Sequence, residues 1–203
     1  MIKKVVLTAI AVLSFLTTNS YAAISEDVIK ESIVKHSMEM GVDPALALSI
    51  AKKESGFRHE LKSPYGAVGV FQVLPSTAKK IGYNPYYLNE NIKAGLTYYK
   101  MMYKMFGSTE LALAAYNAGP GNVKKYGGTI PPFKETKRFV NVIMQDYHNL
   151  KRNPDPFISK YTVKPAIASD KVTEISNPAK ESELPDLNEI PETRQDEILM
   201  EIL

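Results

Sequence analysis

The sequence predicts an all-α domain with at most minor β structure, followed by a flexible acidic C-terminal tail. Apolar residues recur at helical spacing through residues 25–152, and no convincing run of alternating apolar and polar residues indicates a strand there. Capping residues and glycines mark where the helices begin and end. The 203 residues, 44% hydrophobic and 23% charged, suit one globular domain with an extension.

Six helices are expected between residues 25 and 152. Asp43 followed by Pro44 is typical of a helix start, and Gly-Pro-Gly at 119–121 is expected to end a helix. Residues 61–71 carry Gly, Ser and Pro and are expected to form a loop. The expected helices begin near Ser25, Asp43, Pro75, Asn91, Ser108 and Lys134.

Aromatic and apolar residues indicate which faces of these helices are buried. The last helix, ending at Leu150, has an expected apolar stripe of Phe139, Val142, Ile143 and Tyr147. Five tyrosines cluster around the helix expected from Asn91, and we expect most of them in the core: Tyr83, Tyr86, Tyr87, Tyr98 and Tyr99.

The first 22 residues have the three-part pattern of a secretory signal peptide. Two lysines precede an uncharged, mostly apolar run over 5–16, and Ser20 and Ala22 stand at the −3 and −1 positions of a cleavage site before Ala23. The alternative, a membrane anchor, needs about 20 apolar residues to span a bilayer, and the run over 5–16 is shorter. We therefore expect cleavage of residues 1–22 and a periplasmic or secreted protein, without lipidation because the chain has no cysteine.

Charge divides the chain near residue 153. Residues 153–203 carry 5 Lys+Arg and 11 Asp+Glu, a net charge of −6, with 6 of the 13 prolines, whereas the rest of the chain has a net charge of +9. We expect 153–203 to be a largely disordered tail. Apolar residues repeat at four-residue spacing over 198–203, which leaves two interpretations open: a short amphipathic helix that docks on a partner, or a solvated end.

Composition also excludes several kinds of chemistry. The near balance of 25 Lys+Arg and 22 Asp+Glu gives no argument for a nucleic-acid partner. Without cysteine, and with three scattered histidines, the chain offers no transition-metal cluster and no cysteine nucleophile. No phosphate-binding glycine loop is present. We expect no metal and no cofactor, and chemistry that rests on carboxylates and hydroxyls.

Glu54 is a carboxylate on an apolar helix stripe. It follows Ile50 by four residues and Ala47 by seven, so helical geometry places all three on one face. Burial raises a carboxyl pKa and favours the protonated form, which a general acid requires, and glycosidic cleavage needs an acid at the leaving oxygen. Two other interpretations stay open: a last-turn glutamate pointing to solvent, or one paired with Arg58 at i+4.

Four motifs occur in order along the chain. They are Glu-Ser-Gly-Phe at 54–57, Ser-Pro-Tyr-Gly-Ala-Val-Gly-Val-Phe-Gln at 63–72, Ala-Tyr-Asn-Ala-Gly-Pro-Gly at 115–121 and Pro-Phe-Lys-Glu-Thr at 132–136. Together they resemble the soluble lytic transglycosylase (SLT) domain, a family with a goose-type-lysozyme-like helical fold that cleaves bacterial peptidoglycan. We place this domain at residues 23–152.

The resemblance implies that Glu54 is the single catalytic carboxylate. In the family, the acid protonates the leaving oxygen of the β-1,4 bond between N-acetylmuramic acid (MurNAc) and N-acetylglucosamine (GlcNAc). It then acts as base towards the C6 hydroxyl of MurNAc, which closes a 1,6-anhydro ring. Because the attacking hydroxyl is tethered to the sugar, no activated water is needed.

The resemblance also implies a set of substrate-binding residues. These are Ser63, Gln72, Tyr116, Asn117 and Glu135.

Two of these residues have rival interpretations. Tyr116 also suits the core as a helix aromatic, and Glu135 also suits a salt bridge with Lys137 or Arg138. The chain departs from the usual family pattern at Phe71, where methionine is common, and at Phe139, where tyrosine is common.

Two rival functions stay open. A hydrolytic lysozyme on the same fold usually needs a second carboxylate, and Glu60, Glu90 and Glu110 match no motif. The other rival is a non-catalytic peptidoglycan-binding or scaffold protein. Small enzymes of this family often open the wall locally for a secretion, conjugation or pilus assembly machine. The resemblance does not cover the acidic tail, and a separate hypothesis is that this tail recruits the enzyme to such a machine.

Overall fold

A computed structural model describes residues 24–162, and the predicted signal peptide and the chain from 163 onward, including 198–203, lie outside this part. Residues 24–162 form helices joined by loops, with isolated β-bridges of Val68 to Lys62 and to Val73 as their only β structure. The all-α prediction is confirmed. The helices are α1 (Glu26–Glu39), α2 (Pro44–Ser55), α3 (Pro75–Lys80), α4 (Leu88–Phe106), α5 (Thr109–Ala118), α6 (Pro120–Lys125), α7 (Lys134–Arg152) and α8 (Pro156–Thr162).

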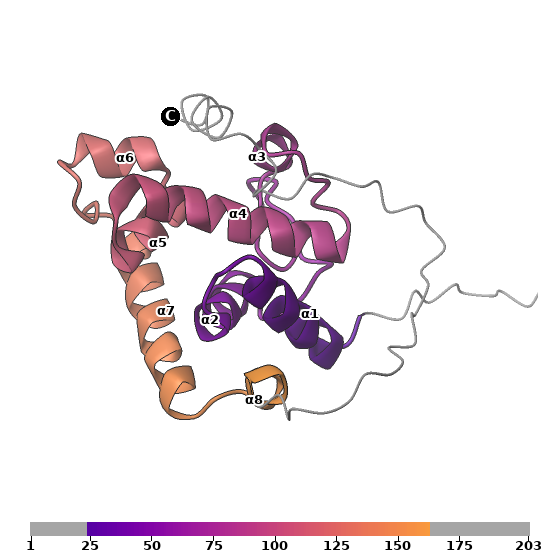
Figure 1. Ribbon diagram of the computed structural model, residues 1–203. Coiled ribbons are helices and arrows are strands. Elements are labelled where there is room, and N and C mark those ends of the chain that lie inside the picture. The colour runs from indigo at the N-terminus through magenta and orange to yellow at the C-terminus, as the bar shows by residue number, and fades with distance from the viewer. Residues whose placement is uncertain (1–23, 163–203) are drawn as a thin grey trace, which may run out of the picture.

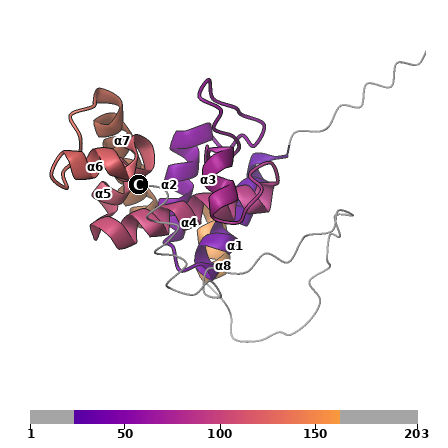
Figure 2. The ribbon, with the colours of Figure 1, turned by 90° about the horizontal axis from the view of Figure 1, so that it is seen from above.

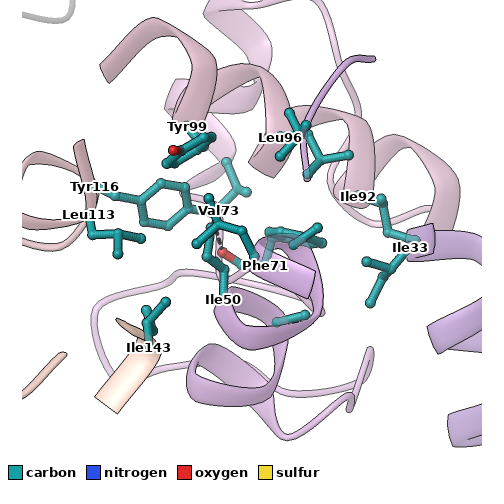
Figure 3. Close-up of a cluster of buried hydrophobic side chains, with 14 of the residues drawn as sticks. Ile33, Ile50, Phe71, Val73, Ile92, Leu96, Tyr99, Leu113, Tyr116 and Ile143 are labelled. Atoms are coloured by element: carbon teal, nitrogen blue, oxygen red, sulfur yellow. Dashed lines mark hydrogen bonds between the residues drawn. The ribbon is translucent and has the colours of Figure 1, made fainter. Parts of the chain in front are cut away.

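Helix α2 lies at the centre of the array, between α1 and α7, while α5 packs against α4, α6 and α7 (Figure 1). Seen from above, α5, α6 and α7 are grouped on one side and α1, α2 and α3 on the other, with α4 running between the groups (Figure 2). The core fills the space where they meet, with fully buried side chains from α2, the 61–74 loop, α4, α5 and α7 (Figure 3). Among them are Ile50, Phe71, Ile92, Leu113 and Ile143.

The predicted caps explain where the helices begin. Asp43 Oδ1 accepts the Ala45 amide at 2.9 Å, and Ser108 Oγ accepts the Leu111 amide at 3.2 Å. The other carboxylate oxygen of Asp43 accepts from Lys151 Nζ at 2.8 Å, so this cap also ties the start of α2 to the end of α7. None of the helices within residues 24–162 is both long and apolar enough to cross a bilayer.

The sequence does not predict helix α6, because Gly-Pro-Gly at 119–121 indicates only the end of a helix. Gly119, at φ 85°, ends α5 and serves as the N-cap of α6, and Pro120 occupies the first position of the new helix, where proline is favoured. Helix α4 also begins earlier than the predicted Asn91, at Leu88. The apolar stripe of α7 was wrong at Val142, which is 39% exposed.

Helix α8 lies in the segment assigned to the disordered tail. Ile158 is buried against the core, and Lys160 Nζ forms an ion pair with Glu31 of α1 at 2.5 Å. The proline density of this segment suggested disorder, but Pro156 stands at the first position of a helix, which proline tolerates. The packed helices therefore continue to Thr162, past the predicted boundary at Arg152.

Candidate active site

A cleft of about 340 Å³ opens where the end of α2, the 61–74 loop and helices α3, α4 and α5 meet. Of the six predicted site residues, Glu135 is not in its lining and stands in the first turn of α7. The other five line the cleft together: Glu54, Ser63, Gln72, Tyr116 and Asn117.

Glu54 occupies the last turn of α2 and is largely buried in the cleft. Burial raises the pKa of its carboxyl from 4.5 to about 8, with the positive charge of Lys53 opposing this shift and the negative charge of Glu135 adding to it. The predicted alternative partner, Arg58, instead donates from Nε to the Ser55 carbonyl at 2.9 Å. Near neutral pH the Glu54 carboxyl is therefore mostly protonated and able to donate its proton.

The residue after Glu54 attaches the end of α2 to the loop that forms the cleft floor. Ser55 Oγ donates to the Val70 carbonyl at 2.9 Å and accepts the Arg58 amide at 3.2 Å. Gly56 ends α2 at φ 61°, a left-handed conformation that favours glycine. This junction fixes the position of Glu54 relative to the loop.

Asn91 of α4 holds the 61–74 loop in place through side-chain hydrogen bonds, a role that the sequence does not predict. Its buried side chain accepts the Phe71 amide at 2.9 Å and donates to the carbonyls of Val68 at 2.9 Å and Pro85 at 3.0 Å. A side chain on Gly69 would overlap the Asn91 amide. Asn91 thus satisfies loop backbone groups that a buried loop would otherwise leave unpaired.

Gln72 lines the cleft and is held by the loop backbone. Its Nε2 donates to the carbonyls of Gly69 at 2.8 Å and Leu61 at 3.1 Å. Its own backbone adopts φ 47°, an uncommon conformation for a residue other than glycine. The hydrogen bonds that Gln72 donates within residues 24–162 therefore go to the loop. No group within residues 24–162 donates to its amide oxygen, which remains free to accept from a ligand.

Tyr116 belongs both to the core and to the cleft, so the two interpretations of this residue are compatible. Its hydroxyl donates to the Phe71 carbonyl at 2.8 Å (Figure 3), and its ring stacks on Phe139 at a centroid distance of 6.5 Å. Burial, together with the nearby charge of Glu54, raises the pKa of the Tyr116 hydroxyl well above 10. Tyr116 therefore stays a neutral hydrogen-bond donor beside the acid.

Asn117 is positioned by a residue that sequence reasoning missed. The buried Thr136, in the first turn of α7, donates from Oγ1 to Asn117 Oδ1 at 2.7 Å. The amide N–H groups of Asn117, which lines the cleft, have no hydrogen-bond partner within residues 24–162. The motif at 132–136 contains Thr136 beside Glu135, so the sequence did point to this position, but only Glu135 was predicted to have a role.

Glu135 is exposed and acts on Glu54 through its charge. Among the described residues it forms no salt bridge with Lys137 or Arg138, the predicted alternative. Helix α7, which carries Glu135, is joined to α2 by an ion pair between Lys52 Nζ and Asp146 Oδ1 at 2.6 Å.

Ser63 closes a tight turn at the cleft rim. Its Oγ accepts the Ala67 amide at 3.1 Å, and its own amide donates to the Ala67 carbonyl at 2.8 Å. The Ser63 hydroxyl proton remains free to donate to a ligand, because both contacts with Ala67 use the other groups of the residue.

The tyrosine cluster is only partly buried, in contrast to the prediction. Tyr83 and Tyr99 are core residues, whereas Tyr86 and Tyr87 are 62% and 57% exposed. Tyr98 lines the cleft, with its ring 5.1 Å from that of Tyr116. Helical spacing alone could not distinguish the cleft face of α4 from its core face.

No group of three or more His, Asp or Glu side chains within residues 24–162 is placed to hold a metal ion. The cleft instead presents one carboxyl group, Glu54, together with amide and hydroxyl groups.

The helical fold and this cleft, with a largely buried glutamate at the end of α2, define a lysozyme-like helical domain. Residues 31–139 match the sequence model of the Transglycosylase SLT domain, and the chain belongs to this family.

The chain is similar to parts of larger proteins. It is 34% identical over 130 residues to the soluble lytic murein transglycosylase of Salmonella typhimurium, and the match covers 52% of this chain and 20% of that protein. It is 28% identical to a transglycosylase of Enterobacteria phage PRD1, over 64% of this chain and 46% of the phage protein. The crystal structure of the 70 kDa soluble lytic transglycosylase from Escherichia coli superimposes with a TM-score of 0.55 and 27% identity, covering 63% of this chain and 25% of that chain.

Proposed function

We propose that this protein is a peptidoglycan lytic transglycosylase that cleaves the MurNAc-β-1,4-GlcNAc bond and forms 1,6-anhydro-MurNAc. One observation carries the proposal: Glu54 is the only carboxylate in the cleft lining formed by residues 24–162, and its pKa is raised to about 8. A single protonated carboxyl suits a reaction in which one group serves first as acid and then as base.

The reaction needs no water. Glu54 gives its proton to the bridging oxygen as the bond from this oxygen to C1 of MurNAc breaks. The Glu54 carboxylate then accepts the proton of the C6 hydroxyl, and the C6 oxygen forms the new bond to C1. Glu54 ends the cycle protonated, as it began, and the tethered nucleophile replaces an activated water.

The other cleft residues have distinct proposed roles. Tyr116 fixes the cleft wall through its bond to Phe71, and its buried ring excludes water from Glu54. The amide N–H groups of Asn117 and the hydroxyl of Ser63 donate to the sugar, whereas the amide oxygen of Gln72 accepts from it. Glu135 supports the protonated state of Glu54 through its charge.

The hydrolytic alternative has less support. Its candidate second carboxylates, Glu60, Glu90 and Glu110, do not line the cleft. Glu90 instead accepts the Asn84 amide at 2.6 Å. Because no second carboxylate within residues 24–162 lines the cleft to activate water, closure by the C6 hydroxyl is the simpler outcome.

Mass spectrometry of digested sacculi tests the reaction. We expect the purified protein to release muropeptides that end in 1,6-anhydro-MurNAc, and the Glu54→Gln protein to release none. The Glu60→Gln protein, altered at an exposed carboxylate outside the cleft, serves as control and keeps the wild-type products. Free reducing ends in place of anhydro ends would contradict the proposal and show that the protein is a hydrolytic lysozyme. Binding to sacculi without any product would favour a scaffold protein.

The predicted signal peptide would deliver this activity to the periplasm or beyond the cell. We further propose that the acidic tail recruits it to an envelope-spanning secretion, conjugation or pilus machine. Unchanged localisation after deletion of residues 163–203 would remove the basis for that recruitment.

A further inference from the structure

We propose that Tyr65 is a sugar-stacking residue whose ring supports a pyranose of the glycan strand at the rim of the cleft, an inference that rests on the proposed function. Tyr65 is 91% exposed, more than any other large hydrophobic side chain within residues 24–162, yet it lines the same cleft as Glu54 and Ser63. A single exposed aromatic side chain on a protein surface is common and needs no explanation. Tyr65 differs because its exposed ring lies in the lining of the cleft that holds Glu54.

The loop presents Tyr65 at the tip of a well-defined turn. The Gly66 amide donates to the Ser63 carbonyl at 3.0 Å, so residues 63–66 form a β-turn with Pro64 second and Tyr65 third. Tyr65 has no positive φ, which excludes a type II turn, and Ser, Pro and Gly occupy the positions that a type I turn prefers. The fixed φ of proline and the bonds between Ser63 and Ala67 hold this turn in place.

Tyr65 has no structural role that explains a large aromatic here. Within the described residues its hydroxyl forms no hydrogen bond and its ring contacts no other ring. Tyr116, by contrast, bonds to Phe71 and contacts the rings of Tyr98 and Phe139. Replacing Tyr65 would therefore disturb binding at the cleft far more than folding.

The chemistry of the rim suits a sugar ring. A β-linked pyranose presents C–H bonds on its faces and hydroxyls at its edge, so an aromatic face can cover the former while a phenolic tip stays in water. Leu74, 44% exposed, is the second exposed large apolar side chain of the lining, and the polar groups of Ser63 and Asn117 lie in the same cleft. Tyrosine supplies such contact area at low cost in conformational entropy.

Direct binding to an inactivated protein tests this role. Calorimetry would measure the affinity of the Glu54→Gln protein for an uncrosslinked tetrasaccharide of alternating GlcNAc and MurNAc. Adding Tyr65→Ala is expected to raise Kd on the order of tenfold, as for other exposed aromatic contacts that become buried on binding. Adding Tyr65→Phe should leave Kd within about twofold, since the ring remains. The matched control is Tyr86→Ala, which removes an exposed tyrosine outside the cleft and should leave Kd unchanged.

Kinetics separate this inference from the proposed function. In the active protein, Tyr65→Ala should raise KM about tenfold with little change in kcat, because the stacking contact is made equally in the ground and transition states. Unchanged Kd and KM, with anhydro products still formed, would overturn the role of Tyr65 and leave the proposed function standing. Failure of the Glu54→Gln protein to bind the tetrasaccharide, with or without Tyr65, would contradict both.

Discussion

Glu54→Gln is expected to lower the rate of glycan cleavage by about a thousandfold or more, the range seen when a general acid–base is removed. Glutamine keeps the shape and burial of the side chain but cannot give up or accept the proton that both steps require. The Glu60→Gln protein should retain wild-type activity, as its carboxylate lies outside the cleft. Activity of the Glu54→Gln protein within tenfold of wild type would show that another group supplies the proton.

The same substitution should stabilise the protein, and the gain should depend on pH. The folded protein keeps the Glu54 proton up to about pH 8, whereas the unfolded chain releases it near 4.5. Between these values the folded state binds more protons, so ionisation of Glu54 lowers the free energy of unfolding as pH rises. The Glu54→Gln protein avoids this loss. Below about pH 4.5 the two proteins should melt together, and above about pH 8 the variant should be more stable by roughly 5 kcal/mol. A difference independent of pH would contradict the raised pKa.

Gly95→Ala is expected to destabilise the fold by about 2–3 kcal/mol, the effect of overfilling a core. A methyl group on Gly95 of α4 would overlap the Cβ and Cγ atoms of Phe71. Phe71 cannot yield easily, because Asn91 holds its amide and the Tyr116 hydroxyl holds its carbonyl. In an exposed helix the same substitution would stabilise by about 1 kcal/mol, so the sign of the effect is diagnostic.

Thermal melting measures the effect of Gly95→Ala. For a chain of this size, 2–3 kcal/mol corresponds to a fall in Tm of roughly 5–10 °C. An unchanged or higher Tm would mean that α4 and the 61–74 loop are not in close contact at Phe71. The absence of a side chain at Gly95 provides the space that the Phe71 ring fills.

Much of the fold could be predicted from local signals. Caps at Asp43 and Ser108 and the helical apolar spacing located most helices, because these features are set by neighbours in the sequence. Helices α2 and α3, which also begin with proline, are predicted, whereas α6 and α8 are not. The Gly-Pro-Gly sequence at 119–121 indicates only the end of a helix, and the prolines and acidic residues of 153–203 indicate disorder. Their formation depends on packing that no local pattern shows.

The candidate site was predictable where a motif carried it. The stripe containing Glu54 placed its carboxyl among apolar residues, and the resemblance supplied the rest of the predicted set. Asn91 and Thr136 were not predicted as site residues, because their roles depend on contacts with loops and helices distant in sequence. Tyr65 and Tyr98 were not predicted to line the cleft, because the spacing of tyrosines in the sequence does not show which of them face a cleft.

The central claim is that Glu54 is a buried acid, protonated near neutral pH. Titration of its side-chain carboxyl by carbon-13 NMR, assigned by comparison with the Glu54→Gln protein, tests this most directly. We predict a Glu54 resonance that titrates with a pKa of about 8, well above the ordinary value of 4.5 for a glutamate. A Glu54 resonance that titrates near 4.5 would show a carboxylate ionised at neutral pH, and Glu54 could then not be the proton donor proposed here.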